Sequence, residues 1–363
     1  MVEKYLITKY FELLGQDKIR CKLCPNMCVI SDEKAGVCTT RVNIGGKLYS
    51  AVYGYPCSIN VDPIEKKPLY HYYPGESILS LGTFGCNLFC KGCQNFDISR
   101  ADANKEFISK TVKDDATRES KLNKLKYYAP EEIVNMTLEN DIKMIAYTYN
   151  EPTVFFEYML DIAKLAKKKN IKNVMVSNGY INPKPLKKLC KYIDAANIDL
   201  KGITEKFYRQ YSKVDIKPIQ ETIKILHKEG IWIELTNLII PELNDDPSDI
   251  KKLCEWIKDT IGTEVPLHFS KFYPHYNASN ISQTPPTILQ KAKEIAFDVG
   301  LKYVYIGNLS FIDNTYCPKC KKEVISREGM NVELKGLKTN KSKNFTECAN
   351  CKTIIPGFFE YSK

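Results

Sequence analysis

Three cysteines with short spacing are the residues of this sequence best suited to chemistry. Cys86, Cys90 and Cys93 form a C-x3-C-x2-C motif that directly follows an apolar segment ending in Gly82-Thr83-Phe84-Gly85. A [4Fe–4S] cluster normally takes four cysteines, so three thiolates leave one iron open for a non-protein ligand. A zinc knuckle is the competing interpretation, but the motif lacks a local histidine as fourth ligand. The spacing and the position after a strand favour the cluster.

A second cysteine group, near the C-terminus, consists of two C-x2-C pairs, Cys317/Cys320 and Cys348/Cys351. Two such thiolate pairs make a tetrahedral site of four sulfurs, for which zinc is the first candidate and mononuclear iron the second. Because protein ligands would fill all four positions, we expect a structural zinc site in a zinc-ribbon-like module.

A third group, near the N-terminus, comprises Cys21, Cys24, Cys28 and Cys38 with the irregular spacing C-x2-C-x3-C-x9-C. Four thiolates can hold an auxiliary iron–sulfur cluster or zinc, and Cys57 could replace one of them. An auxiliary cluster would relay electrons, whereas zinc would only fasten the N-terminal module. Both interpretations stay open. In a reducing compartment, clustered cysteines are metal ligands more often than disulfides.

The motifs need a scaffold, and from residue 77 onward apolar strand-like segments alternate with amphipathic helices. The expected strands are 77–85, 143–149, 173–179, 195–202, 231–241, 266–274 and 303–308. Helices are expected at 155–169, after the N-cap Asp246, and after Pro286, the last with Ile288, Ala292 and Ile295 facing inward. Near-continuous apolar strands separated by helices predict an α/β fold with a parallel sheet covered by helices.

We predict a partial or complete (β/α) barrel, with an open doubly wound sheet as the alternative. Either fold collects chemistry at the carboxyl ends of the strands. The expected domains are a cysteine-rich N-terminal module at 1–75, the barrel core at 76–310 and the zinc-ribbon-like module at 311–363. A polar, charge-rich insertion or lid is expected around 101–128.

Polar residues follow three of the predicted strands, and each set also has a purely local interpretation. Asn150 and Glu151 can cap a helix, Ser177-Asn178-Gly179 can form a turn, and Asp199 with Lys201 can form an ion pair at a strand end. Asn237, His268 and His275 lie near later strand ends, but a lone histidine is more often structural than catalytic.

The cluster motif resembles that of the radical S-adenosylmethionine (radical SAM) superfamily. The continuation Cys93-Gln94-Asn95 is similar to the pyruvate formate-lyase activating-enzyme branch. The segment from Asp62 to His71 and the pattern Cys21-x2-Cys24-Pro25-x2-Cys28 resemble the radical SAM enzymes of the AmmeMemoRadiSam system. That subgroup is associated with AMMECR-like and Memo-like proteins.

The resemblance implies an enzyme in which S-adenosylmethionine chelates the open iron through its amino and carboxylate groups. One electron cleaves it to methionine and a 5′-deoxyadenosyl radical, which abstracts hydrogen from a substrate that the sequence does not identify. It implies cofactor contacts for the six strand-end residues Asn150, Glu151, Ser177, Asn178, Asp199 and Lys201, and a reductant such as a ferredoxin or flavodoxin. The Gly-Gly-Glu-Pro segment of activating enzymes is reduced here to Glu151-Pro152. No catalytic residue is expected beyond the cluster ligands, because hydrogen abstraction needs no general base.

Composition limits the function classes further. The 363 residues are 44% hydrophobic and 26% charged, which excludes a disordered or collagen-like chain. No apolar run approaches the roughly 20 residues of a membrane span, and the N-terminal segment has no signal-peptide core, so a cytoplasmic protein is expected. The activity that the resemblance implies is that of an oxidoreductase. The net charge of +10 is mostly lysine, which favours a solvated surface over a nucleic-acid partner. Radical-mediated methyl, sulfur or carbon–carbon transfer is the alternative reaction, and a zinc-binding scaffold is the alternative of another class.

Overall fold

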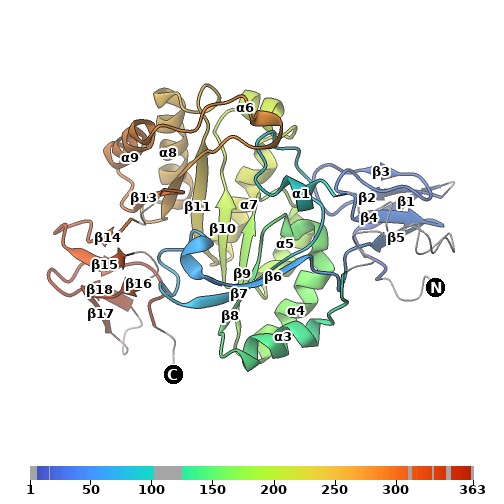
Figure 1. Cartoon of the computed structure of the whole chain (residues 1–363), viewed down its shortest axis with the longest axis horizontal. Coiled ribbons are helices and arrows are strands. Elements are labelled where there is room, and N and C mark those ends of the chain that lie inside the picture. Colours follow the sequence, from blue (N-terminus) through green and yellow to red (C-terminus); the bar gives the residue numbers. More distant parts are fainter. Residues whose placement is uncertain are drawn as a thin grey trace.

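A sheet of eight strands organises the computed structural model, which describes residues 6–15, 17–101, 125–309, 313–328, 331–340 and 345–360 (Figure 1). The strand order is β13-β12-β11-β10-β9-β8-β7-β6, and β6 runs antiparallel to β7 while the other neighbours are parallel. The strands are β6 (Ser58–Pro63), β7 (Ser77–Gly82), β8 (Met144–Tyr147), β9 (Lys172–Ser177), β10 (Ala195–Asp199), β11 (Trp232–Ile239), β12 (Leu267–Lys271) and β13 (Val304–Gly307).

All seven strands expected from residue 77 onward are present and parallel, which confirms the predicted α/β class. The sheet is a partial barrel, since its edge strands β6 and β13 are not paired with each other in the part of the chain that is described. The doubly wound alternative is wrong. A doubly wound sheet reverses its strand order at a switch point, whereas these strands follow one another in sequence order.

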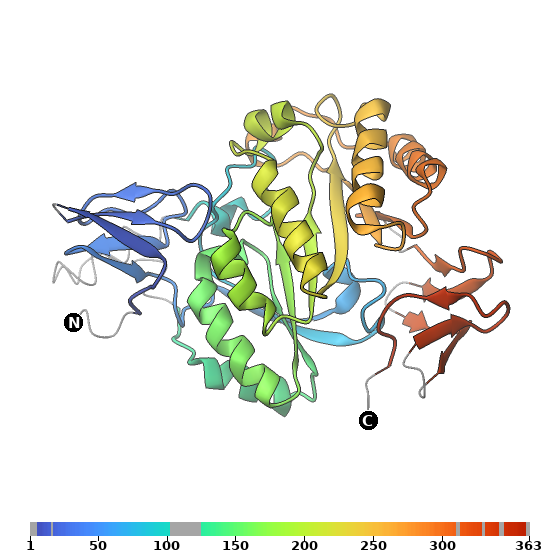
Figure 2. The ribbon, with the colours of Figure 1, turned by 180° about the vertical axis from the view of Figure 1, so that it is seen from behind.

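Helices follow the parallel strands and cover the outer face of the sheet (Figure 2). They and the shorter helical turns are η2 (Ile64–Lys66), α1 (Phe96–Ser99), α3 (Pro130–Glu139), η4 (Pro152–Phe155), α4 (Phe156–Lys168), α5 (Pro183–Cys190), α6 (Glu205–Tyr211), α7 (Lys217–Lys228), α8 (Pro247–Ile261), η5 (Tyr276–Ala278) and α9 (Pro286–Val299). The Asp246 carboxylate caps α8 by accepting the amide of Ser248 at 2.8 Å, as expected.

The expected inward residues of α9 pack against the core, but the most deeply buried stripe is shifted by one residue. In α9 the fully buried residues are Leu289, Ala292 and Ala296, whereas Ile288 and Ile295 are only half-buried. Ile288 and Leu289 are adjacent, so two apolar stripes rotated by one residue fit the same sequence pattern. Packing against the sheet selects the stripe that starts at Leu289.

Small β-modules lie at opposite ends of the central sheet in both views (Figures 1 and 2). The N-terminal strands are β1 (Phe11–Gly15), β2 (Lys18–Cys21), β3 (Val29–Ile30), β4 (Arg41–Ile44) and β5 (Lys47–Ser50). The C-terminal strands are β14 (Thr315–Tyr316), β15 (Glu323–Glu328), β16 (Asn331–Glu333), β17 (Leu337–Asn340), β18 (Phe345–Cys348) and β19 (Ile354–Ile355). Strand β6, which lies within the first 75 residues, joins the central sheet rather than an end module.

A buried polar network holds the C-terminal module at the amino ends of the strands. The Glu234 carboxylate is fully buried and accepts the backbone amides of Tyr70 at 2.9 Å and His71 at 2.8 Å, with His268 Nε2 at 2.7 Å. His71 Nδ1 lies 2.7 Å from the Pro356 carbonyl oxygen and therefore donates to it. His268 thus has a structural place far from the carboxyl ends of the strands.

Most of the polar insertion expected at 101–128 falls on residues 102–124, which lie outside the described residues. Among the helices that are described, none has the length and apolar character needed to cross a bilayer.

Candidate functional site

A cavity of about 650 Å³ lies at the carboxyl ends of the parallel strands, inside the curve of the sheet. Its lining includes all nine residues that the sequence and the resemblance single out there, namely Cys86, Cys90, Cys93, Asn150, Glu151, Ser177, Asn178, Asp199 and Lys201. They come from the loop after β7 and from the ends of β8, β9 and β10. The parallel sheet brings these ends to one edge.

The loop that carries the three cysteines is fixed by the end of α6. The amide of Phe89 donates to the Ser212 carbonyl, and the amide of Lys91 donates to the Tyr211 carbonyl, both at 3.1 Å. Gly92 lies in this contact, where a Cβ would be 2.7 Å from Phe272 Cε2 and 2.8 Å from the Tyr211 hydroxyl. Only glycine fits here without displacing its neighbours.

The electrostatic surroundings of the three thiols suit a group that binds thiolates. Burial raises the pKa of Cys86 and of Cys90, and the nearby Lys201 ammonium opposes this for Cys90. The Asn178 side-chain amide lies 3.8 Å from Cys86 Sγ. A bound metal favours loss of the proton from a buried thiol and stabilises the resulting thiolate. Three sulfur donors facing one side of an open cavity fit a cluster with a vacant corner.

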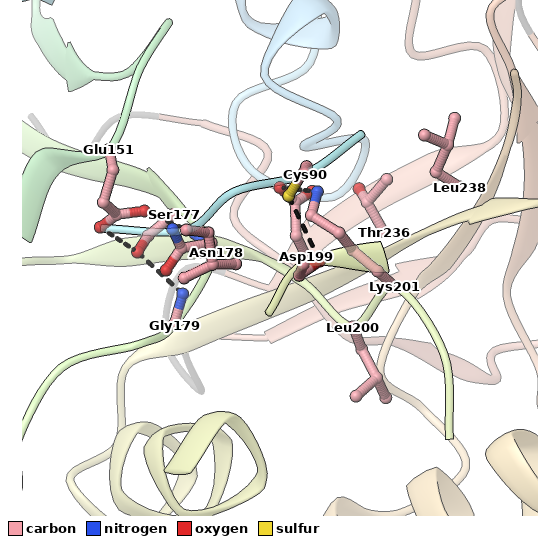
Figure 3. A network of polar contacts seen from close by, with 12 residues as sticks. Cys90, Glu151, Ser177, Asn178, Gly179, Asp199, Leu200, Lys201, Thr236 and Leu238 are labelled. Carbon is pink, nitrogen blue, oxygen red and sulfur yellow. Dashed lines mark hydrogen bonds and ion pairs between the residues drawn. The ribbon is translucent and has the colours of Figure 1, made fainter. Parts of the chain in front are cut away.

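Glu151 joins the ends of β8 and β9 (Figure 3). Its carboxylate is 1% exposed and accepts four hydrogen bonds: from the Thr153 amide at 2.9 Å and hydroxyl at 2.6 Å, from the Ser177 hydroxyl at 2.8 Å and from the Asn178 amide at 2.8 Å. The bond from Thr153 is the helix cap expected from the sequence, here on η4. With these donors satisfied, the carboxylate fixes the backbone that faces the cavity.

Two asparagines connect these strand ends to the cluster loop. Asn150 Nδ2 donates to the Gly85 carbonyl at 2.7 Å, and Asn150 Oδ1 accepts the Thr83 amide at 3.1 Å. Asn178 Nδ2 donates to Asn87 Oδ1 at 2.9 Å. Asn150 therefore holds the loop backbone before Cys86, and Asn178 holds the side chain of Asn87 after it, so both asparagines position the loop whatever else they contact.

Asp199 and Lys201 form the strand-end ion pair expected from the sequence, with Nζ 2.8 Å from Oδ2 (Figure 3). Burial acts against the charged form of Lys201, but Asp199 and Cys90 outweigh it and raise the pKa of the ammonium. A permanent cation beside Cys90 attracts the negative charge of a thiolate-ligated cluster or of a substrate carboxylate.

Several cavity residues were not predicted from the sequence. Lys67 pairs with Asp62 at 2.8 Å, and the Tyr149 hydroxyl donates to the same carboxylate at 2.7 Å. Together with the hydrogen bond from Tyr149, Lys67 lowers the pKa of Asp62 to about 2, against the effect of burial. On the far side, short polar residues of later strands complete the lining, namely Thr236, Ser270 and Asn308. The sequence signals for these residues are weak: the Asp62–His71 segment stands out only by its resemblance, and the polar residues singled out near the later strand ends, Asn237, His268 and His275, are not the ones that line the cavity.

The four C-terminal cysteines converge on one point. Their sulfurs all lie within 4.8 Å of one another, with Cys317 Sγ 3.5 Å from Cys351 Sγ and Cys320 Sγ 3.7 Å from Cys348 Sγ. A zinc–sulfur bond of 2.3 Å in a tetrahedron places its sulfurs about 3.8 Å apart. The two C-x2-C turns thus have the spacing of a single tetrahedral ion.

The four N-terminal cysteines also meet, lining one small cavity together with Arg41 and Asn87. Cys57 does not line it: its thiol contacts the Gly82 carbonyl oxygen at 3.6 Å. The structure does not support Cys57 as a replacement for one of the four, because Cys57 directly precedes β6 and its amide donates to the Gly82 carbonyl at the end of β7. Cys254 on α8 is fully buried and Cys190 on α5 nearly so, and both are core residues.

Comparison with known proteins gives consistent results. The model of the radical SAM superfamily matches residues 80–257. An uncharacterized protein of Methanocaldococcus jannaschii is 40% identical over 327 residues, which cover 90% of this chain and 92% of the relative. The pyruvate formate-lyase-activating enzyme of Clostridium pasteurianum is 23% identical over 188 residues, covering 51% of this chain and 72% of that enzyme. A radical SAM methyltransferase structure from Sphaerobacter thermophilus superimposes with a TM-score of 0.48 at 9% identity, covering 84% of this chain and 76% of that one.

Proposed function

The chain belongs to the radical SAM superfamily, as an enzyme similar to pyruvate formate-lyase activating enzyme, and we propose that Cys86, Cys90 and Cys93 hold its [4Fe–4S] cluster. The superfamily implies this cluster and S-adenosylmethionine as cofactors. One observation carries the assignment: the three cysteines and the six polar strand-end residues line one cavity at the carboxyl ends of parallel strands.

The bound cluster supplies the electron that splits S-adenosylmethionine into methionine and the radical that takes hydrogen from the substrate. The protein supplies position. Asn150 holds the loop backbone before Cys86 and Asn178 holds the Asn87 side chain after it, while Glu151 joins the ends of β8 and β9. In this proposal the backbone and side chains at these two strand ends bind the methionine ammonium and the ribose, in place of the missing Gly-Gly.

Lys201 performs the electrostatic part of this arrangement. Its ammonium lies beside Cys90 and is held by Asp199, so it can neutralise cluster charge and attract the carboxylate of S-adenosylmethionine. The lining contributed by the later strand ends includes three short polar residues, Thr236, Ser270 and Asn308, beside the apolar Leu238. Short side chains leave room there, and their hydroxyl and amide groups can bond to a peptide backbone.

We therefore propose that the substrate is a segment of another protein, by analogy with relatives whose names describe them as activating enzymes of a lyase and of a dehydratase. The reductant is a small one-electron carrier such as a ferredoxin or flavodoxin. The C-terminal cysteines are proposed to bind structural zinc, which the spacing of their sulfurs supports.

The proposal is tested by anaerobic reconstitution followed by measurement of 5′-deoxyadenosine after addition of S-adenosylmethionine and dithionite. We expect product from the wild type and a loss of at least about a hundredfold in Cys86→Ala, Cys90→Ala and Cys93→Ala. Cys190→Ala removes a thiol from α5, away from the cavity, and should keep wild-type turnover. Normal turnover in the three site variants would refute the assignment.

A further inference from the structure

The N-terminal cysteine group has the form of a built site. Cys21 ends β2, Cys24 and Cys28 flank the turn that leads into β3, and Cys38 lies in the loop before β4. Cys21 and Cys38 are buried, and the Cys21 amide donates to the Cys28 carbonyl at 2.9 Å. The four cysteines line one cavity, which is distinct from the cavity that the proposed function uses.

Arg41 gives an independent sign that this cavity takes an anionic group. Its side chain is 2% exposed and lines the same cavity. Only Nη1 has a hydrogen-bonding partner, Glu157 Oε2 at 2.5 Å, whereas Nε and Nη2 have none in the described part of the chain. Leaving a buried donor unsatisfied is costly, and more so when the donor is charged. Neutral thiols are weak acceptors, whereas thiolates at Cys21 and Cys38, which are electrostatic neighbours of Arg41, would satisfy this cation.

The N-terminal site differs from the C-terminal site in the spacing of its sulfurs. The C-terminal four lie within 4.8 Å of one another, the spacing of one ion. Among the described residues, the N-terminal four are not gathered within that distance, although they face one cavity. Thiolates that bind the corners of a cluster lie farther apart than thiolates that share a single metal ion. The wider spacing therefore favours a cluster over zinc.

The N-terminal site also touches the loop of the central site. A Cβ on Gly85, the residue before Cys86, would lie 2.4 Å from the Cys38 carbonyl oxygen, so the two backbones are in direct contact. Gly85 has a φ of +89°, and glycine is what permits both this conformation and this approach. On the other side, Asn26 Nδ2 donates to the Asn87 carbonyl at 2.8 Å. Cys38 of the N-terminal site thus contacts Gly85, and Gly85 is bonded directly to Cys86 of the central site.

We propose that Cys21, Cys24, Cys28 and Cys38 bind a second [4Fe–4S] cluster, paired with Arg41, which passes electrons to the cluster of the central site. In each transfer the N-terminal cluster is oxidised by one electron and the central cluster is reduced by one. A low-potential one-electron donor, such as dithionite or a small redox protein, then reduces the N-terminal cluster again. The relay rests on the proposed function, whereas the presence of the second cluster does not.

Metal analysis of three forms of the full chain tests the cluster itself. After anaerobic reconstitution we expect about eight irons in the wild type and about four in the triple variant Cys86→Ala/Cys90→Ala/Cys93→Ala. About four irons are also expected in Cys21→Ser/Cys24→Ser, while Cys190→Ala keeps all eight. A triple variant with no iron, or with a second zinc in addition to the C-terminal one, would overturn the proposal. If the triple variant binds four irons but the wild type does not cleave S-adenosylmethionine, only the proposed function is refuted and the second cluster stands.

Variants at Arg41 keep the test decisive if the cysteine variant does not fold. In the triple-variant background, Arg41→Gln should retain iron but shift the cluster to a lower reduction potential, because a cation stabilises the more negative reduced state. Arg41→Lys keeps the charge and should lie closer to the parent. Equal potentials in all three forms would contradict the pairing. In the fully reduced wild type, the short separation predicts electron paramagnetic resonance spectra broadened by coupling between two clusters, and two uncoupled signals would contradict the relay.

Discussion

The central cluster loop should not tolerate a single added methyl group at Gly92. The Cβ of Gly92→Ala would lie 2.7 Å from Phe272 Cε2, whereas carbon atoms pack at about 3.5–4.0 Å. Phe272 is 1% exposed and Tyr211 is 2% exposed, so neither ring can swing into solvent. The loop itself must therefore move by close to 1 Å, away from the Tyr211 carbonyl that holds the amide of Lys91.

Overpacking of this kind costs about 1–3 kcal/mol. If the loop relieves the strain by leaving its position, the same free energy lowers the equilibrium population of molecules in which the loop is correctly placed. At 1.36 kcal/mol per factor of ten, turnover should fall roughly 5- to 150-fold. Gly307→Ala at the end of β13 is the matched control, because the nearest atom to its Cβ is Ser270 Oγ at an ordinary 3.9 Å. That substitution should be neutral or slightly stabilising.

The assay measures 5′-deoxyadenosine formation and bound iron in both variants after identical reconstitution. Gly92→Ala should show slow turnover with reduced iron, and Gly307→Ala should match the wild type. Wild-type turnover in Gly92→Ala, or an equal loss in both variants, would refute the argument that Gly92 sets the loop against α6.

Four further predictions test the surrounding structure. Burial lowers the pKa of His71 to about 4 from 6.5, so the unfolded chain takes up the proton first and stability falls as the pH drops. Between about pH 7.5 and about pH 5.5 the loss is about 1.3 kcal/mol in urea unfolding; the same pH dependence in His71→Gln would contradict it. Lys201→Met should slow S-adenosylmethionine cleavage at least about tenfold and Lys201→Arg less so, because the cation beside Cys90 is lost only in the first; equal rates would exclude an electrostatic role. Cys348→Ser should reduce bound zinc from about one equivalent to nearly none in metal analysis and lower the melting temperature, and unchanged zinc would remove the proposed site. In Glu151→Gln, a side-chain NH2 group takes the place of the carboxylate oxygen that now accepts the backbone amide of Asn178. The lost hydrogen bond should cost about 1–3 kcal/mol of stability. An unchanged denaturant midpoint would show that this hydrogen bond does not contribute to folding.

Much of the central architecture could be predicted because parallel strands buried on both faces have a simple sequence signature. Segments such as 143–149 and 231–241 are nearly continuous apolar runs between helices. Once the strands are parallel, residues at their carboxyl ends must meet. This is why Ser177 and Asp199 could be placed at one site without knowledge of any contact between them.

The parts that were missed depend on contacts between distant segments. Asp62 belongs to an antiparallel edge strand, and its partner Tyr149 is 87 residues away. No local sequence pattern therefore indicates that the two residues pair. The approach of Cys38 to Gly85 is a loop packed on a loop, which has no periodicity. The inward face of α9 was ambiguous because two adjacent apolar residues each fit the helical repeat.

The central claim is that three thiolates leave one iron corner open for S-adenosylmethionine. It is tested most directly by recording electron paramagnetic resonance spectra of the dithionite-reduced Cys21→Ser/Cys24→Ser variant, in which only the central site can hold a cluster. We predict that adding S-adenosylmethionine changes the g values of this signal, because the ligand binds the open iron. A reduced cluster whose spectrum is the same with and without S-adenosylmethionine would contradict the account.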